Sequence, residues 1–352
     1  MQNSIFRYIF TGRNDLLKTS ERIEDELNRG NSFIVSPKRE TVVSLGGPAK
    51  NWVKCVLKDR GFSIYVDDRF FVKESTIAQI LTSLWLNLLD FGKIRLESFQ
   101  LSERLHKRLI FVQPAKSLVQ KLRQKNKPCF GTIFKPSFNL SLKDKINIAK
   151  KMAKLGATFV KEDETYLIDR VKLIKESEKI QQSMRLVSND CYYVPNITSY
   201  LTDNDIFRDL YGIGVRVAMV NYLIAGLPNV YNLQEKSYNI LLWGHRVGYK
   251  SIQKYISMQA LASVAVYSGM NLVHIGTPFI EVNTELNASN RIYSAIKQIN
   301  KDVIPVFTKV SSQIVPSLIK TFGPHITLMA CGSIRTKGEL DWQKVENLIK
   351  SF

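Results

Sequence analysis

Residues 131–164 read GTIFKPSFNLSLKDKINIAKKMAKLGATFVKEDE, and this stretch decides the fold class. A short apolar run ends at Lys135, an amphipathic stretch ends at Gly156, and a second apolar run ends at Lys161. Short apolar runs bounded by turn residues indicate buried strands, and a glycine often ends a helix. The stretch therefore predicts a strand, a helix and a second strand in succession.

The same rhythm continues along the chain as far as Gly332. We expect eight strands, in TIFKP, TFVKED, CYYVPNI, RVAMVNY, LLWGHR, LVHIGT, VIPVFT and ITLMACG. Amphipathic stretches lie between them, several ending in glycine. Eight strand–helix units in about 220 residues predict a TIM barrel, whose chemistry lies at the carboxyl ends of the strands.

The first part of the chain has a different pattern. Residues 1–128 mix strand-like and helix-like pieces, among them SFIVSP, TVVSL and IRLESFQL, without a repeated strand–helix unit. The sequence thus predicts an α/β protein with an N-terminal α+β domain of the ferredoxin-like kind at 1–128. A TIM-barrel domain at 129–352 follows it, with the basic segment QKLRQKNKP as the linker.

Composition limits the possible partners and the compartment. The chain has 352 residues and a net charge of +19, which attracts anions in general, but its lysines are spread along the whole length and no RNA-binding signature is present. We therefore expect no specific nucleic-acid binding. The four cysteines are far apart and the apolar stretches are short, which favours a cytoplasmic protein with reduced thiols and no membrane contact.

Polar and charged residues recur where the expected strands end. A lone cluster such as Lys161, Asp163 and Glu164 is most simply a strand edge facing water. A barrel, however, brings all strand ends to one mouth, so their coincidence favours an active site. The other strand-end residues are Lys135, Asn196, His245, Arg246, His274, Thr308 and Gly332.

Several of these motifs, in this order, resemble the large-subunit superfamily of ribulose bisphosphate carboxylase (RuBisCO). They are GTIFKP, FVKEDE, HR and HIGT, and the interval between Lys135 and Lys161 matches the family's interval between its two strand-end lysines. The resemblance implies that Lys161 takes up CO2 as a carbamate. Together with Asp163 and Glu164 this carbamate would bind Mg²⁺, which prefers hard oxygen donors.

The resemblance also assigns roles to other strand-end residues. Lys135 matches the lysine that moves protons at the substrate's enediolate centre, for which its pKa must lie near neutrality. Arg246 and His274 match residues that hold a substrate phosphate, and a planar guanidinium suits that task. His245 matches a residue beside the metal, and Thr308 stands where the family usually has serine.

Two residues of the N-terminal domain match positions that complete a neighbouring subunit's site. Asn87, in LTSLWLNLL, resembles the asparagine that reaches metal and substrate, and Glu26, in EDELNRGNSF, resembles the N-terminal active-site glutamate. The resemblance thus implies a homodimer with shared active sites.

The sequence departs from the carboxylase pattern at two lysine positions, one of which should face the added CO2. The second lysine of the first-strand motif is replaced by Ser137, and the loop after HIGT carries Glu281 in place of a lysine. An anion in place of a cation would repel a developing carboxylate, so we expect no CO2 fixation.

The second phosphate site has also diverged. TKVSS places Lys309 and Val310 where the family has glycines, and ACGSI leaves Gly332 between Cys331 and Ser333. Backbone amides at such a turn can still bind an anion.

A RuBisCO-like protein of the form IV type fits this combination of retained and lost residues. Such a protein would be a Mg²⁺-dependent enolase or isomerase, or a decarboxylase, acting through an enolate on a phosphorylated ketose or sugar acid. Lys135 is the expected base, with the carbamate of Lys161 as the alternative. Two other hypotheses stay open: a noncatalytic binding or scaffold protein, and a genuine carboxylase.

Overall fold

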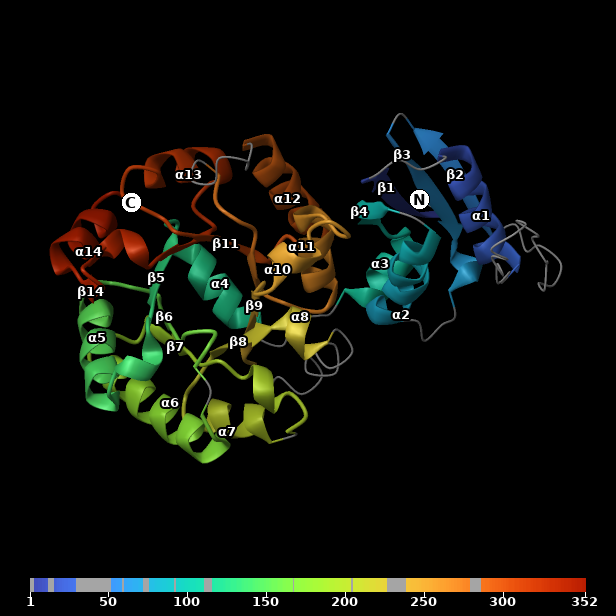
Figure 1. The fold of residues 1–352 in the computed structure, drawn as a ribbon. Helices are drawn as coiled ribbons and strands as arrows, with labels where there is room; N and C mark the ends of the chain where they lie inside the picture. The colour runs from blue at the N-terminus through green and yellow to red at the C-terminus, as the bar shows by residue number, and fades with distance from the viewer. Residues whose placement is uncertain are drawn as a thin grey trace. The chain divides into compact units, whose positions relative to one another are not determined.

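The structure of the chain is a computed structural model, shown as a ribbon in Figure 1. It describes residues 3–11, 16–29, 52–58, 60–71, 76–91, 93–110, 116–166, 168–203, 205–226, 239–278 and 286–352. The strands expected in SFIVSP and TVVSL, and the residue Glu281, lie outside this described part. The chain forms two compact units, one of residues 1–110 with 249–264, the other of residues 111–248 with 265–352.

The first unit contains a four-stranded antiparallel sheet in the order β2-β3-β1-β4. Its elements in chain order are β1 (Asn3–Phe10), α1 (Leu16–Arg29), β2 (Val53–Lys58), β3 (Gly61–Asp67), α2 (Ile77–Leu81), β4 (Ile94–Gln100) and α3 (Glu103–Leu109). A βαββαβ succession with this strand order is the ferredoxin-like arrangement, which confirms the predicted class.

Alternation along the strands builds the core of this unit. Phe6 and Tyr8 of β1 are buried, as are Phe62 and Ile64 of β3, because every second side chain of a strand points to the same face. Tyr8 stacks on Phe62 with 4.9 Å between ring centroids. The unit also includes α10 (Tyr249–Ile252), and Ile256 just after it forms a parallel bridge with Leu96 of β4.

The second unit is the predicted barrel. Its strands are β5 (Cys129–Ile133), β6 (Phe159–Lys161), β7 (Tyr192–Val194), β8 (Val217–Asn221), β9 (Leu241–His245), β10 (Leu272–His274), β11 (Ile304–Thr308) and β12 (Thr327–Ala330). They form one parallel sheet in the order β7-β6-β5-β12-β11-β10-β9-β8. An isolated parallel bridge from Asn196, after β7, to Met219 of β8 closes the ring.

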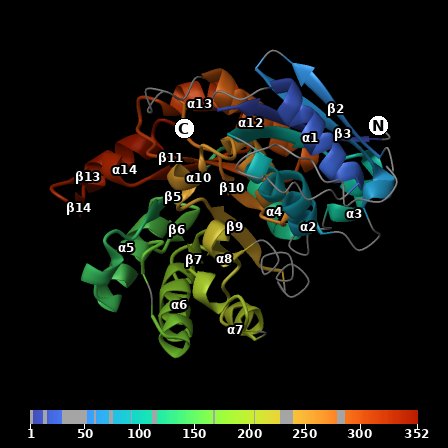
Figure 2. The ribbon, with the colours of Figure 1, turned by 45° about the vertical axis from the view of Figure 1, so that its right-hand side comes forward.

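Helices surround these strands, as Figure 1 shows for the second unit. They are α5 (Leu142–Lys154), α6 (Arg170–Arg185), α7 (Ile206–Gly212), α8 (Tyr222–Ala225), α12 (Leu286–Ile299), α13 (Val315–Phe322) and α14 (Trp342–Ile349). Helix α11 (Met258–Tyr267) begins in the first unit, and its last residues, from Ala265, belong to the second. Helices α5 and α6 lie side by side in both ribbon views (Figure 2). Ser141 and Asp144 form a capping box at the start of α5, in which the side chain of each accepts from the backbone N–H of the other. The local sequence therefore fixes where this helix begins.

Helix α4 (Lys116–Gln124) occupies the segment that was expected to include the linker. Its Val119 and Leu122 are buried in one apolar cluster with the first residues of the barrel strands, such as Phe159 and Leu272. The helix therefore closes the amino-terminal end of the barrel, and the second compact unit begins at Phe111, before the boundary expected at residue 128. The basic residues had hidden an apolar stripe with helical spacing.

None of the helices in the described ranges is long and apolar enough to cross a membrane.

Candidate active site at the mouth of the barrel

The structure places the predicted site residues of the second unit at the carboxyl ends of the barrel strands. Lys161, His245, His274 and Thr308 are the last residues of β6, β9, β10 and β11. Lys135 follows β5 by two residues, while Asp163 and Glu164 follow β6. Because parallel strands turn their carboxyl ends to the same rim, these side chains come together at one mouth.

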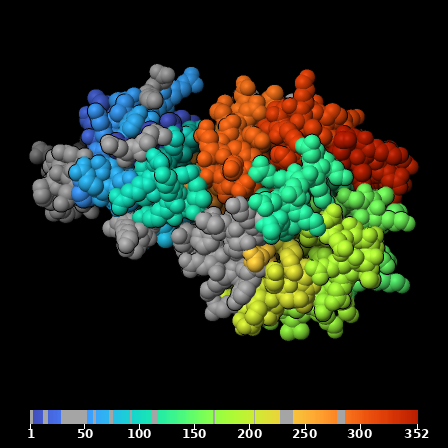
Figure 3. Space-filling view, turned by 180° about the vertical axis from the view of Figure 1, so that it is seen from behind, coloured from blue at the N-terminus to red at the C-terminus, as the bar shows by residue number. Residues whose placement is uncertain are grey.

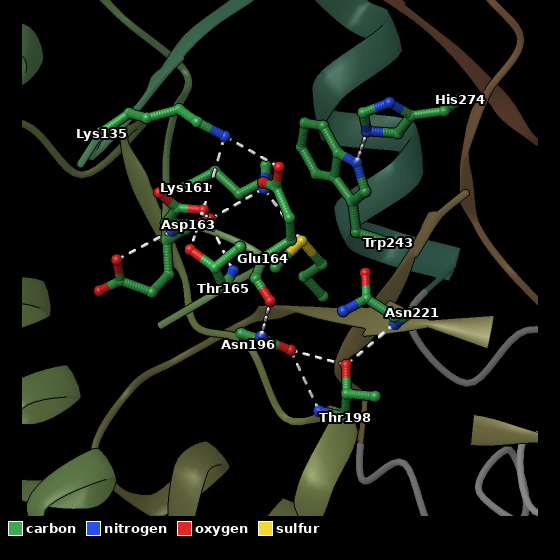
Figure 4. A network of polar contacts seen from close by, with 12 residues as sticks. Lys135, Lys161, Asp163, Glu164, Thr165, Asn196, Thr198, Asn221, Trp243 and His274 are labelled. Atoms are coloured by element: carbon green, nitrogen blue, oxygen red, sulfur yellow. Dashed lines mark hydrogen bonds and ion pairs between the residues drawn. The ribbon is translucent and has the colours of Figure 1, made fainter. Parts of the chain in front are cut away.

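Two lysines and two carboxylates form the centre of this mouth (Figure 4). The Nζ atom of Lys135 lies 2.9 Å from Oε1 of Glu164 and 3.6 Å from Oδ1 of Asp163. The Nζ atom of Lys161 lies 3.9 Å from Oε2 of Glu164. Burial raises the pKa of Glu164, but the charge of Lys161 and the hydrogen bond from Lys135 outweigh it and bring that pKa to about 2. Glu164 is therefore ionised at neutral pH.

Lys161 is fully buried beneath this cluster. Its ammonium donates to the carbonyl oxygen of Glu162 at 2.8 Å and to the sulfur of Met219 at 2.9 Å. Burial lowers the pKa of Lys161 to about 8, against the smaller opposing effect of Glu164 and its neighbours. A substantial neutral fraction is thus available near physiological pH, and the neutral amine is the form that reacts with CO2.

Lys135 differs from the expectation made for it. Burial lowers the pKa of Lys135, but its hydrogen bond to Glu164 and the charges of Glu164 and Asp163 raise it by more, so the net pKa lies above the ordinary value. The expected shift towards neutrality is therefore wrong for this arrangement of side chains. A cationic Lys135 sits between the two carboxylates and can donate a proton or screen their charges.

A buried layer behind the mouth fixes the position of the carboxylates. Glu162 points away from the mouth, and its Oε2 accepts from Lys145 at 3.0 Å and from the Tyr193 hydroxyl at 2.9 Å. Its Oε1 accepts from the backbone N–H of Asp163 at 2.9 Å. Lys145 is itself buried and lies 3.5 Å from Oε2 of Glu176. A helix lysine thus holds the strand end that carries the predicted metal ligands.

Three polar residues on neighbouring strand ends extend the site. Asn196 donates to the backbone carbonyl of Glu164 at 3.1 Å, and its amide oxygen accepts from the Thr198 hydroxyl at 2.6 Å. The Thr198 hydroxyl in turn accepts from the backbone N–H of Asn221 at 3.0 Å. The side-chain oxygen of Asn221 is buried and has no hydrogen-bond partner. The sequence interpretation missed Asn221, although an asparagine ending an apolar strand run was a usable signal.

The two histidines of the mouth are neutral. His274 is 3% exposed, and its Nε2 accepts a hydrogen bond from the Trp243 indole at 2.6 Å. Burial, followed by the charge of His245, lowers the pKa of His274 well below 6.5, and burial lowers that of His245 to about 3. The centroids of the His245 and His274 rings lie 4.8 Å apart. His274 could therefore offer a phosphate only its other ring nitrogen, and no positive charge.

Arg246 supplies a cation near these histidines. It directly follows β9, and a Cβ built on Gly276 would lie 3.6 Å from its Nη2, so the guanidinium lies beside the loop after β10. Thr308 is held at its backbone, where its N–H donates to the Thr277 hydroxyl at 2.9 Å. The phosphate role predicted for Arg246, His274 and Thr308 stays a prediction.

The turn after β11 keeps a glycine-like backbone in spite of its sequence. Lys309 has φ of 57°, in the left-handed region that glycine adopts most easily. Such a conformation costs a non-glycine residue about 1–3 kcal/mol. After β12, Gly332 is exposed, and a Cβ there would meet open space. The turn geometry associated with the second phosphate site has thus partly survived the substitutions.

The two N-terminal predictions meet within the first unit. Glu26 of α1 and Asn87, at the start of the 3-10 turn Asn87–Phe91, share a side-chain hydrogen bond. Burial and the charge of Asp25 raise the pKa of Glu26, against the lowering effect of this bond. Oε2 of Glu26 is buried without a partner. The two residues thus contact each other within the first unit, and the role predicted for them in a neighbouring subunit's site stays a prediction.

A divalent cation fits the mouth only if Lys161 contributes a ligand. Among the described residues no group of three His, Cys, Asp or Glu side chains could hold a metal ion. Asp163 and Glu164 are hard oxygen donors, and Oε2 of Glu164 is buried without a hydrogen-bond partner. A carbamate on Lys161 would add a third anionic oxygen donor. The donor set fits Mg²⁺ in that form.

A parallel eight-stranded barrel combined with a ferredoxin-like unit is the fold of the RuBisCO large subunit. The chain superposes on octameric ribulose-1,5-bisphosphate carboxylase/oxygenase from Pyrococcus horikoshii with a TM-score of 0.79, at 18% identity over 99% of this chain and 87% of that one. It superposes on a rubisco-like protein from Burkholderia fungorum with a TM-score of 0.77, at 17% identity over 100% and 93%.

Sequence comparison agrees with the fold. The chain is 23% identical to the ribulose bisphosphate carboxylase of Methanocaldococcus jannaschii over 244 residues, which are 60% of this chain and 57% of that relative. No family model matches the sequence. The resemblance to the RuBisCO superfamily is therefore confirmed. Because carboxylases and a rubisco-like protein both match, similarity alone does not distinguish their activities.

Proposed function

We propose that this chain is a RuBisCO-like enzyme that enolises a phosphorylated ketose or sugar acid without fixing CO2. The observation that carries the proposal is the group formed by Lys135, Lys161, Asp163 and Glu164 at the barrel mouth. It combines anionic metal donors with a lysine that can carry a proton, the two kinds of group that enolisation requires.

Each residue of the mouth has its own proposed role. Asp163, Glu164 and a carbamate on Lys161 would hold Mg²⁺, which when bound polarises the substrate carbonyl. Lys135, whose side chain is 42% exposed, is the proposed proton carrier. As an ammonium it can donate a proton to the substrate oxygen, and it could take the α-proton only after losing its own proton, which a cation bound by Asp163 and Glu164 would favour by repelling the ammonium. Arg246 provides the charge that orients a substrate phosphate. The neutral His245 and His274 lie beside each other at the mouth.

The loss of carboxylation is supported two positions after Lys135. Ser137 stands where the family carries a second lysine, and it is fully buried, with its hydroxyl lacking a hydrogen-bond partner. The second cation of the first-strand motif is therefore missing. Glu281, the second departure, lies outside the described residues.

We propose further that the functional unit is a homodimer in which the Glu26–Asn87 pair completes the partner's mouth. The two residues are hydrogen-bonded, and Oε2 of Glu26 is buried but free to accept. The matching Pyrococcus horikoshii enzyme is an octamer. All four cysteines are free, which supports the proposed cytoplasmic location.

The test has two parts. The protein is incubated with bicarbonate and Mg²⁺, the carbamate is trapped and located by mass spectrometry, and solvent deuterium exchange into a panel of phosphorylated ketoses and sugar acids is then followed. We expect a carbamate on Lys161 and exchange that is lost in Lys161→Met. Absence of carbamate, Mg²⁺ binding and exchange would favour the noncatalytic protein, and incorporation of radiolabelled CO2 into ribulose bisphosphate would favour the carboxylase.

A further inference from the structure

A second cavity lies at the end of the barrel opposite the mouth. Its volume is about 510 Å³, within the range of small-molecule sites. Its walls come from the positions just before strands: Tyr192 begins β7, Arg216 precedes β8 and Asn239 precedes β9. Figure 3 shows α4 beside the region of α6 and α7 on this side of the second unit. We call this cavity the basal pocket; Ser117, Leu118, Lys121, Gln181, Arg185, Asn189, Tyr192, Tyr211, Arg216 and Asn239 line it.

Two arginines of the basal pocket are held in place by backbone carbonyls. Arg185 donates through Nη2 to Gly214 at 3.0 Å. Arg216 donates through Nη1 to the carbonyls of Tyr211 at 2.8 Å and Val215 at 2.9 Å, with its guanidinium 3.9 Å above the Tyr211 ring. These contacts use part of each guanidinium and leave further N–H groups for a ligand.

Gly214 allows Arg185 to take this position. Its φ is +92°, and a Cβ there would lie 2.4 Å from Nη1 of Arg185. A larger residue would push the guanidinium out of the pocket wall. The main chain is therefore shaped to receive an arginine at this point.

The pocket carries more positive charge than its own carboxylates neutralise. Within the part of the chain that the structure describes, no ion pair joins Arg185 or Arg216 to an acidic side chain. Asp190 forms ion pairs with Lys121 at 2.7 Å and with Lys125 at 3.0 Å, so two lysines share one carboxylate. Burial lowers the pKa of Arg216; Tyr211 opposes this effect, and the nearby charge of Arg185 adds a smaller lowering effect. Like charges fixed close together are unfavourable unless an anion lies between them.

We propose that the basal pocket is a binding site for a small phosphate ester, separate from the catalytic mouth. The phosphate lies between Arg185 and Arg216, whose planar guanidinium groups match its oxygens. The organic part lies against Tyr192 and Leu118, while Asn189 and Ser117 offer polar contacts. Such a ligand would bind without touching the reacting substrate, because the two sites lie at opposite ends of the strands.

Site-resolved protection from chemical labelling tests the proposal directly. The full chain is treated with phenylglyoxal, which modifies arginine, with and without inorganic phosphate or ribose 5-phosphate, and the peptides are read by mass spectrometry. We expect both probes to protect Arg185 and Arg216, with the ester effective at lower concentration. The Arg246 peptide reports on the mouth separately. Unchanged labelling of Arg185 and Arg216 at saturating probe overturns the proposal.

Variants give a second, independent readout. In an Arg246→Gln background, which removes the cation of the mouth, we expect Arg185→Gln to weaken ribose 5-phosphate binding about tenfold or more in titration calorimetry. Asn189→Asp leaves both arginines and their carbonyl contacts intact but adds a negative charge, so it should weaken binding similarly even if Arg185→Gln impairs folding. The control Arg208→Gln alters a surface arginine paired with Asp205 and should bind normally. Equal affinity in all three variants, or Arg185-dependent binding of RNA without binding of the ester, refutes the proposed ligand.

Discussion

Lys135 and Glu164 come from neighbouring strands of the barrel and form an ion pair, with 2.9 Å between Nζ and Oε1. The same ammonium lies 3.6 Å from Oδ1 of Asp163, so one lysine lies close to both carboxylates of the predicted metal site. A divalent cation bound by these carboxylates would repel that ammonium. The geometry therefore links metal binding to the position and proton affinity of the proposed proton carrier.

Replacing Lys135 by methionine should reduce proton exchange with the substrate without weakening Mg²⁺ binding. We expect Lys135→Met to bind Mg²⁺ at least as tightly as the wild type in the presence of bicarbonate, because the competing ammonium is gone. Deuterium exchange into substrate should fall by about 10²–10⁴-fold, the usual contribution of a general acid or base. Calorimetry with Mg²⁺ and exchange measured by NMR would check this, with Lys150→Met as the surface control. A loss of Mg²⁺ affinity parallel to the loss of exchange would contradict the assignment.

The buried Lys145 should matter for stability as well as for activity. Lys145→Met leaves Glu162 and Glu176 without their buried cation, and removing one partner of a buried ion pair destabilises a protein by about 3–5 kcal/mol. Denaturant unfolding measures this loss. The double variant Lys145→Met with Glu162→Gln should recover part of it, because fewer uncompensated charges remain. Losses that simply add would show that Lys145 and Glu162 are not coupled.

The barrel could be predicted from the sequence because each strand is a short apolar run and polar residues end or closely follow most of them. Lys161, Asp163 and Glu164 illustrate this: the strand fixes their place, and the mouth follows from the parallel topology. The described parts of the N-terminal unit also follow the predicted class. The metal-binding and catalytic roles of these residues remain predictions, which the proposed experiments test.

Other features depended on tertiary contacts that a sequence pattern does not contain. The direction of the Lys135 pKa shift depends on distances to Glu164 and Asp163, and the state of His274 depends on an indole from the adjacent strand. The function of α4 was missed because its basic composition obscured Val119 and Leu122, which pack into the barrel end. Similarly, only the fold brings Arg185 and Arg216 together.

The Trp243 indole is expected to stabilise the mouth through His274. Trp243→Phe removes the donor to Nε2 and leaves a buried nitrogen unsatisfied, which costs about 1–3 kcal/mol beyond the loss of packing. Guanidinium unfolding would measure the change in the free energy of unfolding. Trp342→Phe, at a partly exposed tryptophan of α14 that contacts Lys151, is the matched control and should lose less. Equal losses in the two variants would mean that the Trp243–His274 bond contributes little.

Lys297 should produce a measurable dependence of stability on pH. Burial lowers its pKa to about 8 from an ordinary value of 10.5, and its ammonium donates to the carbonyls of Lys301 and Val303. Between these two pH values the unfolded chain binds more protons than the folded one, so the free energy of unfolding rises with pH, by at most about 1.4 kcal/mol per pH unit.

Unfolding of the wild type and of Lys297→Met, measured from pH 7 to about 10.5, isolates this effect. We expect the difference in stability, wild type minus variant, to increase across the upper part of this range, because the variant has no proton to lose at position 297. Lys320→Met, at an exposed lysine of α13, should reproduce the wild-type slope. A constant difference between wild type and Lys297→Met would show that Lys297 titrates at the same pH in the folded and unfolded chain.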